Sequence, residues 1–511
     1  MGSRTLRSQW DETVRYYPDS LFLEFISTQD QVTRYTYAQF DRLVKRAANF
    51  FLSLGVEKGE LVALHMHNSP EYIVCWLALA QIGAVSAPLN EYYRVGESGE
   101  ILRWNGIRRI VTEPRAESMY VQHRDELELD TIILSRGVSA YPNVYNLEQE
   151  MAYQPDTLLQ DRPVASDDMA VVLFTSGTTR FPKGAIYTHC NVVYGGIFHV
   201  QQLSMRAGER FLSAMPCYHM DFQEMAVMPV ICAGGTLVMV EHYSASRFWR
   251  QICQYRANYT DTMSVMNRTM LLQPVQPWEK DHCLKQIYFS MGLSAEEKEA
   301  FESRFRVRLL NTYGMTETVT AVTCAPLTGE QRWPSVGRPA LSYEIKIRRE
   351  DGSEAAPGEV GEICIGGVPG RTLCPGYYRN EKATRNLYED GKWLRSGDKG
   401  YLDEDGWLFF LGRDGDMIKR SGENVSALEV ECILTSHPDI ADAAVIGVPD
   451  PLRDYKIKAF VLPREGAVLT EEAVIDYCVG HLAKFKVPSQ VAFVRSFERT
   501  STGKIKKNLL H

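Results

Sequence analysis

The sequence predicts an α/β protein with a large N-terminal body of mostly parallel sheets, a β subdomain and a small mobile α+β C-terminal domain. Helix-like and strand-like segments alternate between residues 34 and 89, and again at 211–239 and 286–310. Such alternation is typical of parallel sheets that are covered by helices on both faces. Short β segments with turns follow residue 338, and a compact mixture of strands and helices follows residue 416.

Individual elements can be placed in order along the chain. Residues 36–54 carry apolar side chains at helical spacing, and Gly55 suits the end of a helix. A short strand is predicted within residues 61–70 and a helix at 71–83. In the last part of the chain, strand patterns occur at 443–449, 458–463 and 491–494, and helix patterns at 427–437 and 471–482. We therefore predict two domains, 1–414 and 415–511.

Composition limits the classes of function. A chain of 511 residues is too long for one ordinary core, and its net charge of -8 argues against a nucleic-acid binder. No stretch approaches the ~18 uninterrupted apolar residues of a membrane helix, and the charged N-terminus lacks a signal-peptide core. The eleven cysteines are scattered without a CxxC pair. Reduced thiols in a cytoplasmic enzyme are therefore expected.

A loop rich in small residues gives the strongest chemical signal. A strand pattern at residues 170–174 leads into TSGTTRFPKG, which contains Lys183. Small residues let backbone N–H groups approach phosphate oxygens, and the lysine adds positive charge. The loop is not a Walker P-loop, because Pro182 and Gly184 stand where that motif has glycine and serine or threonine. Taken alone, the segment could equally be an ordinary turn.

Three further segments carry groups suited to nucleotide chemistry. Glu317 in NTYGMTET is a hard oxygen ligand suited to Mg²⁺, and Thr316 beside it offers a hydroxyl. Asp398 lies between two glycines and could accept hydrogen bonds from a sugar diol. Lys504 follows Gly503 near the end of the sequence. Each also has an ordinary interpretation, as a strand connection, a turn-supporting aspartate or a solvated surface lysine.

Taken together and in this order, the segments resemble the adenylate-forming superfamily of acyl-CoA synthetases, peptide-synthetase adenylation domains and luciferases. The resemblance covers essentially the whole chain and is carried by TSGTT…PKG, YGMTE, SGD, GR…IK.SGEN and TGK. It implies that a carboxylic acid reacts with ATP, in the presence of Mg²⁺, to form an acyl-adenylate. The acyl group then passes to a thiol, for which coenzyme A is expected.

The resemblance implies a role for each matched residue. Lys504 would reach the substrate carboxylate and the α-phosphate, Glu317 would help to hold Mg²⁺, and Thr175 and His219 complete the catalytic candidates. No proton-transfer base is required for adenylation, because the attacking carboxylate is already ionised. The residues expected to bind the nucleotide are Thr175, Ser176, Gly177, Thr178, Thr179, Lys183, Asn311, Thr312, Tyr313, Gly314, Met315, Thr316, Asp398 and Arg413.

In this superfamily the C-terminal domain rotates between the two half-reactions, withdrawing the lysine and presenting the SGEN loop. Lys419, Gly422 and Glu423 match that region here and are expected to contact the nucleotide or coenzyme A. Gly415 stands where the family's pivot is usually Asp or Lys. Glycine permits the change in φ and ψ but costs more entropy to fix in either state.

The acyl pocket is expected around MPCYHMD and YFSMGL. Its candidate residues are Tyr218, His219, Asp221, Tyr288, Ser290, Met291 and Gly292. Within the superfamily, the chain is most similar to bacterial crotonobetaine/carnitine-CoA ligases, through RYTYAQF, VALHMHNSPEYIVCW, MPCYHMD, LSAEEKEAF, RWPSVGRP, MIKRSGENVS and AKFKVPS. Those enzymes act on short acids that bear a quaternary ammonium. Aromatic faces and an acid such as Asp221 would suit that cation, although an aromatic-lined core is the alternative.

Two alternatives stay open. A stand-alone adenylation enzyme could charge a carrier protein, but no carrier domain is fused and AKFKVP resembles the tails of acyl-CoA ligases. A non-catalytic nucleotide-binding protein would not need Lys504. A metal hydrolase is disfavoured, because no third ligand accompanies His65 and His67 in the sequence. The expected partners are a small carboxylic acid and coenzyme A, and a homodimer is compatible with the sequence.

Overall fold

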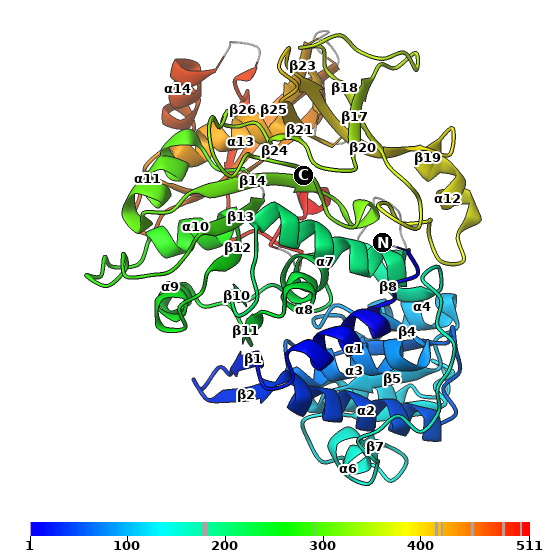
Figure 1. Cartoon of the computed structure of the whole chain (residues 1–511). Coiled ribbons are helices and arrows are strands. Elements are labelled where there is room, and N and C mark those ends of the chain that lie inside the picture. Colours follow the sequence, from blue (N-terminus) through cyan, green and yellow to red (C-terminus); the bar gives the residue numbers. More distant parts are fainter. Residues whose placement is uncertain are drawn as a thin grey trace.

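Two large sheets form the N-terminal body of the protein, which we describe from a computed structural model (Figure 1). The structure describes residues 2–175, 182–290, 292–413, 417–420, 423–450, 454–482, 486–500 and 503–511.

The first large sheet has nine strands in the order β16-β15-β14-β13-β12-β10-β11-β1-β2. Its centre, from β14 to β1, is parallel, and β15, β16 and β2 extend its edges in antiparallel fashion. The strands are β1 (Leu21–Ile26), β2 (Val32–Thr36), β10 (Arg210–Ser213), β11 (Thr236–Val240), β12 (Tyr259–Met263), β13 (Gln286–Ser290), β14 (Leu309–Gly314), β15 (Ala321–Cys324) and β16 (Arg338–Pro339).

The second large sheet has seven strands in the order β7-β6-β5-β3-β4-β8-β9. All neighbouring strands are parallel except β8 and β9. These two strands are antiparallel, and the loop rich in small residues lies between them in the sequence. The strands are β3 (Leu61–His65), β4 (Val85–Pro88), β5 (Arg109–Thr112), β6 (Thr131–Leu134), β7 (Tyr145–Asn146), β8 (Met169–Thr175) and β9 (Lys183–Thr188).

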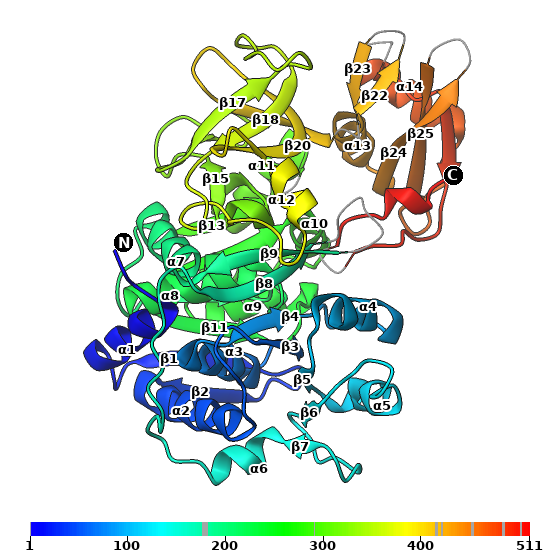
Figure 2. The same ribbon diagram turned by 90° about the vertical axis from the view of Figure 1, so that its right-hand side faces the viewer.

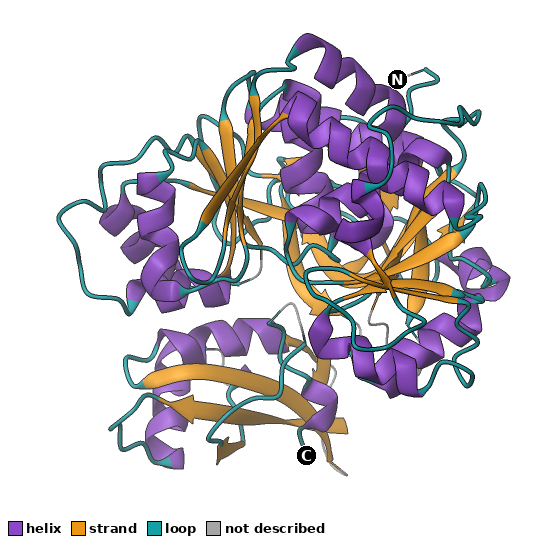
Figure 3. Ribbon diagram, turned by 90° about the horizontal axis from the view of Figure 1, so that it is seen from below, coloured by secondary structure: helices purple, strands orange, loops and turns teal. Residues whose placement is uncertain are grey.

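A layer of helices lies between the two sheets, and other helices cover their outer faces (Figure 3). Within the layer, α1, α2, α3, α7 and α8 pack against one another, with α2 against β1 and α3 against β3. The helices of the body are α1 (Leu6–Tyr16), α2 (Tyr37–Ser53), α3 (Pro70–Ile82), α4 (Val95–Asn105), α5 (Pro114–Gln122), α6 (Leu147–Ala152), α7 (His189–Leu203), the π-helix η1 (Asp221–Val227), α8 (Met228–Ala233), α9 (Ala245–Gln254), α10 (Ser264–Leu271), α11 (Ala295–Phe305) and the 3₁₀ turn η2 (Thr316–Thr318).

Local sequence signals explain why the helices begin and end where they do. The Thr36 side chain accepts a hydrogen bond from the Gln39 backbone at the start of α2, and Gly55 follows its end with φ of 76°. Ser69 caps α3, which ends at Gly83 with φ of 73°. The predicted helices at 36–54 and 71–83 and the predicted strand within 61–70 are therefore confirmed.

A β subdomain follows the body. It is built on a five-stranded antiparallel sheet of β17 (Glu344–Arg348), β18 (Gly361–Gly366), β19 (Tyr388–Glu389), β20 (Trp393–Leu402) and β21 (Leu408–Arg413), with α12 (Glu381–Leu387) at one end.

The C-terminal part has its own sheet and its own hydrophobic core (Figure 2). Its elements are β22 (Met417–Arg420), β23 (Glu423–Ser426), α13 (Ala427–Ser436), β24 (Ile440–Asp450), β25 (Asp454–Pro463), α14 (Glu471–His481), β26 (Gln490–Phe493) and the 3₁₀ turn η5 (Lys507–Leu509). The predicted fold class is thus confirmed. The predicted boundary between residues 414 and 415 lies outside the described residues, so the division into two domains stays a prediction.

Two further findings bear on the sequence predictions. None of the helices in the described part of the chain is long and apolar enough to cross a membrane. The eleven cysteines are free thiols, as expected.

Candidate active site

Three side chains meet where the loop rich in small residues leads into β9. Lys183 begins β9, and its Nζ lies 5.2 Å from the centre of the Tyr377 ring. The Tyr377 hydroxyl donates a hydrogen bond of 2.6 Å to Oε1 of Glu317, which is buried. Lys183 and Glu317 were predicted from sequence motifs, whereas Tyr377 stands in no such motif. A cation and a carboxylate are thereby held together where phosphate and metal chemistry was expected.

The turn that carries Glu317 is fixed by its neighbours. A Cβ on Gly314 would lie 2.6 Å from the Thr320 carbonyl oxygen, so glycine is required there. The Tyr187 hydroxyl donates a 2.6 Å hydrogen bond to the Thr316 carbonyl oxygen. These contacts set the direction in which Glu317 leaves the end of β14.

Two other predicted nucleotide residues on β14 use their side chains structurally. The Asn311 amide donates to the carbonyl oxygen of Ser335 at 2.9 Å, and the Thr312 hydroxyl donates to that of Phe289 at 3.1 Å. Met315, next to the turn, is half-buried. Any contact of Asn311 and Thr312 with a nucleotide would therefore run mainly through their backbone.

Asp398, predicted to bind the ribose, forms the centre of a second cluster with Arg413 and Tyr313. Its Oδ1 accepts from Arg413 Nε at 3.0 Å, and its Oδ2 accepts from the Tyr313 hydroxyl at 2.7 Å. Burial raises the pKa of Asp398, although the charges of Arg413 and Lys504 oppose the shift. The predicted residues Tyr313, Asp398 and Arg413 therefore lie together. The charge of Lys504 also favours the ionised form of the Asp398 carboxyl group.

The C-terminal lysine faces the body. A Cβ on Gly503 would lie 3.5 Å from the Val265 side chain on α10, so this end of the chain touches the body directly. Burial acts to raise the pKa of Asp221, but His219 and Lys504 hold it below its ordinary value. Lys504 therefore lies where its charge reaches both Asp221 and Asp398.

Helix α13 supports this arrangement from the other side of the contact. Arg268 on α10 donates to the Thr435 hydroxyl on α13 at 3.4 Å. A Cβ on Gly292 would lie 3.1 Å from Leu428 and 3.2 Å from Cys432, both on α13. Gly292, expected in the acyl pocket, thus faces the C-terminal domain.

Because Gly292 leaves no spare room, Gly292→Val should disturb the docked position of α13. We expect the rate of pyrophosphate release to fall while thioester formation from added acyl-adenylate changes little, since the resemblance to adenylate-forming enzymes implies that only the first step uses Lys504. Paired assays of the two half-reactions provide the measurement. Gly480→Val is the matched control, because a Cβ there meets nothing within 4 Å. Equal losses in both steps would contradict this role for Gly292.

The expected acyl pocket contains an acidic pair that the sequence analysis only half predicted. His219 Nδ1 lies 3.2 Å from Asp221 Oδ2. Asp261 on β12 is 3% exposed and lies opposite Tyr288 on β13. The Ser213 hydroxyl donates to its Oδ2 at 3.1 Å, and Oδ1 has no hydrogen-bond partner among the described residues. Burial raises the pKa of Asp261 well above its ordinary value, and the charge of Asp221 adds to the shift.

His199 on α7 completes this cluster. It is fully buried, and its Nδ1 lies 2.9 Å from the Tyr288 hydroxyl. Burial lowers the pKa of His199 to about 3, so the ring is neutral. Of the other predicted pocket residues, Tyr218 and Ser290 are half-buried. His199 and Asp261 carry no motif, so sequence reasoning missed them.

A fully buried glutamic acid lies behind the pocket. Glu224 in η1 has no hydrogen-bond partner for either oxygen among the described residues. Gly195 on α7 makes room for it, since a Cβ there would lie 2.4 Å from Glu224 Oε2. Burial raises the pKa of Glu224 well above its ordinary value, so the folded protein holds it protonated.

The folded-state pKa of Glu224 exceeds the unfolded one, so its contribution to stability is complete below about pH 4.3 and is lost as the pH rises. Glu224→Gln cannot ionise. Above the unfolded pKa the wild type should therefore lose stability relative to this variant, by at most about 1.4 kcal/mol per pH unit, until the folded-state pKa is passed. Denaturant unfolding at several pH values tests this, with exposed Glu404→Gln as the control. A difference that does not change with pH would contradict the assignment.

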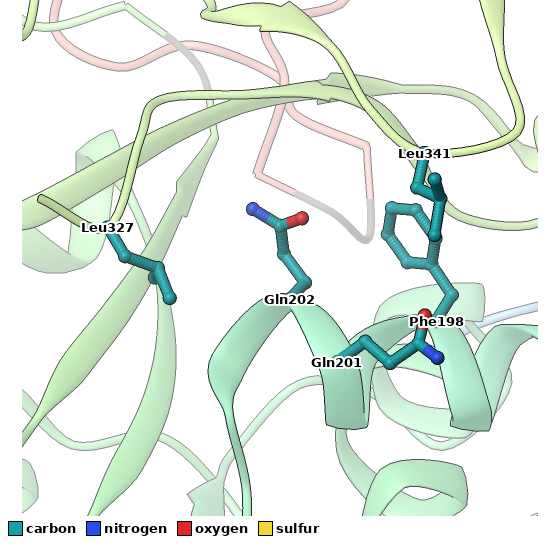
Figure 4. A pocket seen from close by; sticks show the side chains of 5 residues that line it. All are labelled: Phe198, Gln201, Gln202, Leu327 and Leu341. Atoms are coloured by element: carbon teal, nitrogen blue, oxygen red, sulfur yellow. The ribbon is translucent and has the colours of Figure 1, made fainter.

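A separate hollow of about 260 Å³ opens at the end of α7. Figure 4 shows its lining, which consists of Phe198, Gln201, Gln202, Leu327 and Leu341. The Gln202 side chain also forms a hydrogen bond with the Cys324 side chain. None of the residues predicted for the acyl pocket lines this hollow.

Several predicted residues lie outside the described part of the chain, namely Ser176, Gly177, Thr178, Thr179, Met291, Gly415 and Gly422. The side chains of Lys419 and Glu423 are likewise not described. Thr175, at the end of β8, lies with its hydroxyl 3.4 Å from the Lys183 carbonyl oxygen. Lys486, in the AKFKVP segment, pairs with Glu429 at 2.6 Å.

Known proteins are similar to this chain over its whole length. The profile described as AMP-binding enzyme matches residues 10–378, and the one described as AMP-binding enzyme C-terminal domain matches residues 429–504. The chain is 42% identical to a crotonobetaine/carnitine–CoA ligase of Citrobacter koseri over 515 aligned positions, covering 100% of this chain and 99% of that protein.

Solved structures share the fold at lower identity. The anthranilate CoA ligase AuaEII in complex with anthranoyl-AMP has a TM-score of 0.89 and 23% identity, covering 99% of this chain and 96% of that one. ATP-bound MatB from Rhodopseudomonas palustris has a TM-score of 0.88 and 24% identity, covering 99% and 98%.

Proposed function

We propose a substrate for this chain, which belongs to the AMP-binding enzyme family and is an AMP-forming acid–CoA ligase. The substrate is a short carboxylic acid bearing a quaternary ammonium. The acid would react with ATP to give an acyl-adenylate and pyrophosphate. The thiol of coenzyme A would then displace AMP and form the thioester.

The charges of the described residues suit the first step. An anionic carboxylate must approach an anionic phosphate, and this repulsion has to be offset by positive charge. Lys183 lies over the Tyr377 ring, and the charge of Lys504 acts on both Asp221 and Asp398. Lys504 would therefore stabilise the charge that develops between the carboxylate and the α-phosphate, while Asp398 and Arg413 hold the ribose.

The donors near Glu317 fit Mg²⁺. This ion takes oxygen ligands, usually one or two carboxylates together with phosphates and water. Glu317 is buried and has one oxygen held by Tyr377, which leaves the other directed by the fixed turn. Bound there, Mg²⁺ would neutralise phosphate charge.

The acidic pair at Asp221 and Asp261 carries the assignment of the substrate. A quaternary ammonium has no N–H to donate, so it is recognised by negative charge and aromatic faces rather than by hydrogen bonds. Asp261 offers an oxygen without a described hydrogen-bond partner, opposite Tyr288. The charge of Lys504 acts on Asp221, and the charge of Asp221 acts on Asp261, so the three groups lie near one another. An acid that extends from Lys504 toward Asp261 would therefore place its carboxylate at Lys504 and its cation at Asp261. The names of the relatives that are 41–42% identical point to the same substrate class.

A pyrophosphate-release assay with coenzyme A tests this substrate. Carnitine and crotonobetaine would be compared with aryl and fatty acids. The sharpest pair is 4-(trimethylammonio)butanoate and 5,5-dimethylhexanoate, which share one shape and differ in charge. We expect the cationic acids to react with the higher kcat/KM. Preference for the neutral isostere would reject the proposed substrate and leave the ligase class intact. Replacing coenzyme A by carrier proteins in the same assay tests which thiol accepts the acyl group. A cytoplasmic location and a homodimer remain predictions.

A further inference from the structure

Three groups that can bind metal ions converge away from the nucleotide cleft, where the two large sheets meet. His67 follows β3, Glu91 follows β4 and His242 follows β11. One potential ligand atom from each residue lies within 4.8 Å of the other two. No third ligand accompanies His65 and His67 in their own segment, but the fold brings Glu91 and His242 to His67 from the ends of other strands. His65 itself is not part of the group, since its Nδ1 lies 2.7 Å from the Tyr120 hydroxyl.

The orientation of His67 is fixed by two carboxylates. Its Nδ1 contacts Glu113, which follows β5, and its Nε2 lies 2.9 Å from Glu91 Oε2. The ring of His242 stands at 87° to that of His67, with the ring centres 5.0 Å apart. Histidines that bind metals usually give their other ring nitrogen to a carboxylate, which fixes the ring and makes it a better ligand. Glu113 stands in that position.

We propose that His67, Glu91 and His242 form a binding site for a divalent transition metal of the zinc class, with Glu113 as the positioning residue for His67. Two imidazole nitrogens and one carboxylate are a donor set that suits Zn²⁺ and leaves a fourth position for water. Mg²⁺ and Ca²⁺ prefer sites made of oxygen ligands alone. The proposal is independent of the acid that the enzyme activates.

The surrounding charges leave the three ligands available. Arg136 is engaged mainly by Glu241, at 2.6 Å, and reaches Glu113 only at 3.5 Å. Arg115 likewise approaches Glu91 only at 3.5 Å. The competing interpretation is an ion pair in which a charged His67 bridges Glu91 and Glu113 without any metal.

His242 distinguishes the two interpretations. An ion pair at His67 has no use for a second imidazole, yet a ring nitrogen of His242 lies within 4.8 Å of ligand atoms of both His67 and Glu91. In the metal site, by contrast, His242 supplies one of the three ligands.

A metal at this position would have a structural effect on the active site. Asn68, next to His67, donates to the carbonyl oxygens of Met215 and Val240 and accepts from the Cys217 backbone. Cys217 lies two residues before His219. The metal would thus join the carboxyl ends of strands from both sheets and brace the segment that carries His219.

Competition with a chromophoric chelator tests the site on the full-length protein, without any assay of ligase activity. We expect one Zn²⁺ per chain, bound more tightly than Mg²⁺ or Ca²⁺, and a higher Tm in its presence because the metal binds only the folded state. His242→Ala should abolish the Tm shift and weaken Zn²⁺ binding at least ~10-fold, and Glu113→Gln should weaken it by about 10- to 100-fold. His242 is half-buried, so the fold of its variant can be verified by the Tm without metal.

Exposed His481→Ala is the matched control and should bind Zn²⁺ like the wild type. The eleven free cysteines could also hold zinc, but they would do so equally in every variant. Equal Zn²⁺ affinity in the wild type and His242→Ala would overturn the proposal. So would the absence of binding above that of Mg²⁺, which would leave His67 as the centre of an ion pair.

Discussion

Replacement of Lys504 by alanine should lower the rate of acyl-adenylate formation by about 10²- to 10³-fold, the effect typical of losing one group that stabilises transition-state charge. The charge of Lys504 influences the carboxyl groups of Asp221 and Asp398, beside which we propose that the acid and the ribose bind. A lysine in that position offsets the repulsion between carboxylate and phosphate. Carboxylate-dependent pyrophosphate release measures this step.

Thioester formation from synthetic acyl-adenylate should be nearly unchanged in Lys504→Ala, because that step forms no new bond at the phosphate. Lys506→Ala is the matched control, as an exposed lysine two residues away on the same segment. If Lys504→Ala slowed both half-reactions equally, or if Lys506→Ala had the same effect, Lys504 would have to be regarded as a structural residue.

The nucleotide end of the site could be predicted from the sequence because its residues occur in short local motifs. Lys183, Glu317, Asp398 and Lys504 each stand in a glycine-containing segment, and membership of the AMP-binding enzyme family confirms the resemblance that placed them in one superfamily. The strands and helices could be predicted for a similar reason. Apolar periodicity and caps, such as Thr36 at the start of α2, depend on neighbours along the chain.

The acyl end could not be predicted in the same way, because its contacts join residues that are distant in sequence. Asp261, which we propose as a pocket residue, is set opposite Tyr288 only by the pairing of β12 with β13. His199 joins them from α7. Gly292 could be located in the sequence, but its contact with α13 depends on how the C-terminal domain docks. Sequence gives the type of such residues, and only the packing of the sheets gives their neighbours.

Asparagine in place of Asp261 should remove the preference for a cationic acid while preserving the shape of the site. The KM for 4-(trimethylammonio)butanoate should rise by roughly 10- to 100-fold, equivalent to about 1.4–2.7 kcal/mol of binding free energy. The KM for 5,5-dimethylhexanoate should stay within about twofold of the wild type, since no charge is lost in that complex. Exposed Asp156→Asn is the control for the substitution itself. Equal losses with both acids would show that Asp261 supports the fold of the pocket rather than the choice of substrate.

The titration of Asp261 supplies a second readout that a purely structural role would not change. Burial raises the pKa of Asp261 well above its ordinary value, so without a substrate the protonated form of the group is favoured. A cation placed beside it favours the ionised form and lowers this pKa, so binding of the cationic acid should release a proton. Calorimetry in buffers of different ionisation enthalpy measures that proton. We expect release with 4-(trimethylammonio)butanoate in the wild type, and none with 5,5-dimethylhexanoate or in Asp261→Asn. Release that persists in Asp261→Asn would assign the proton to another group and remove Asp261 from the recognition of the cation.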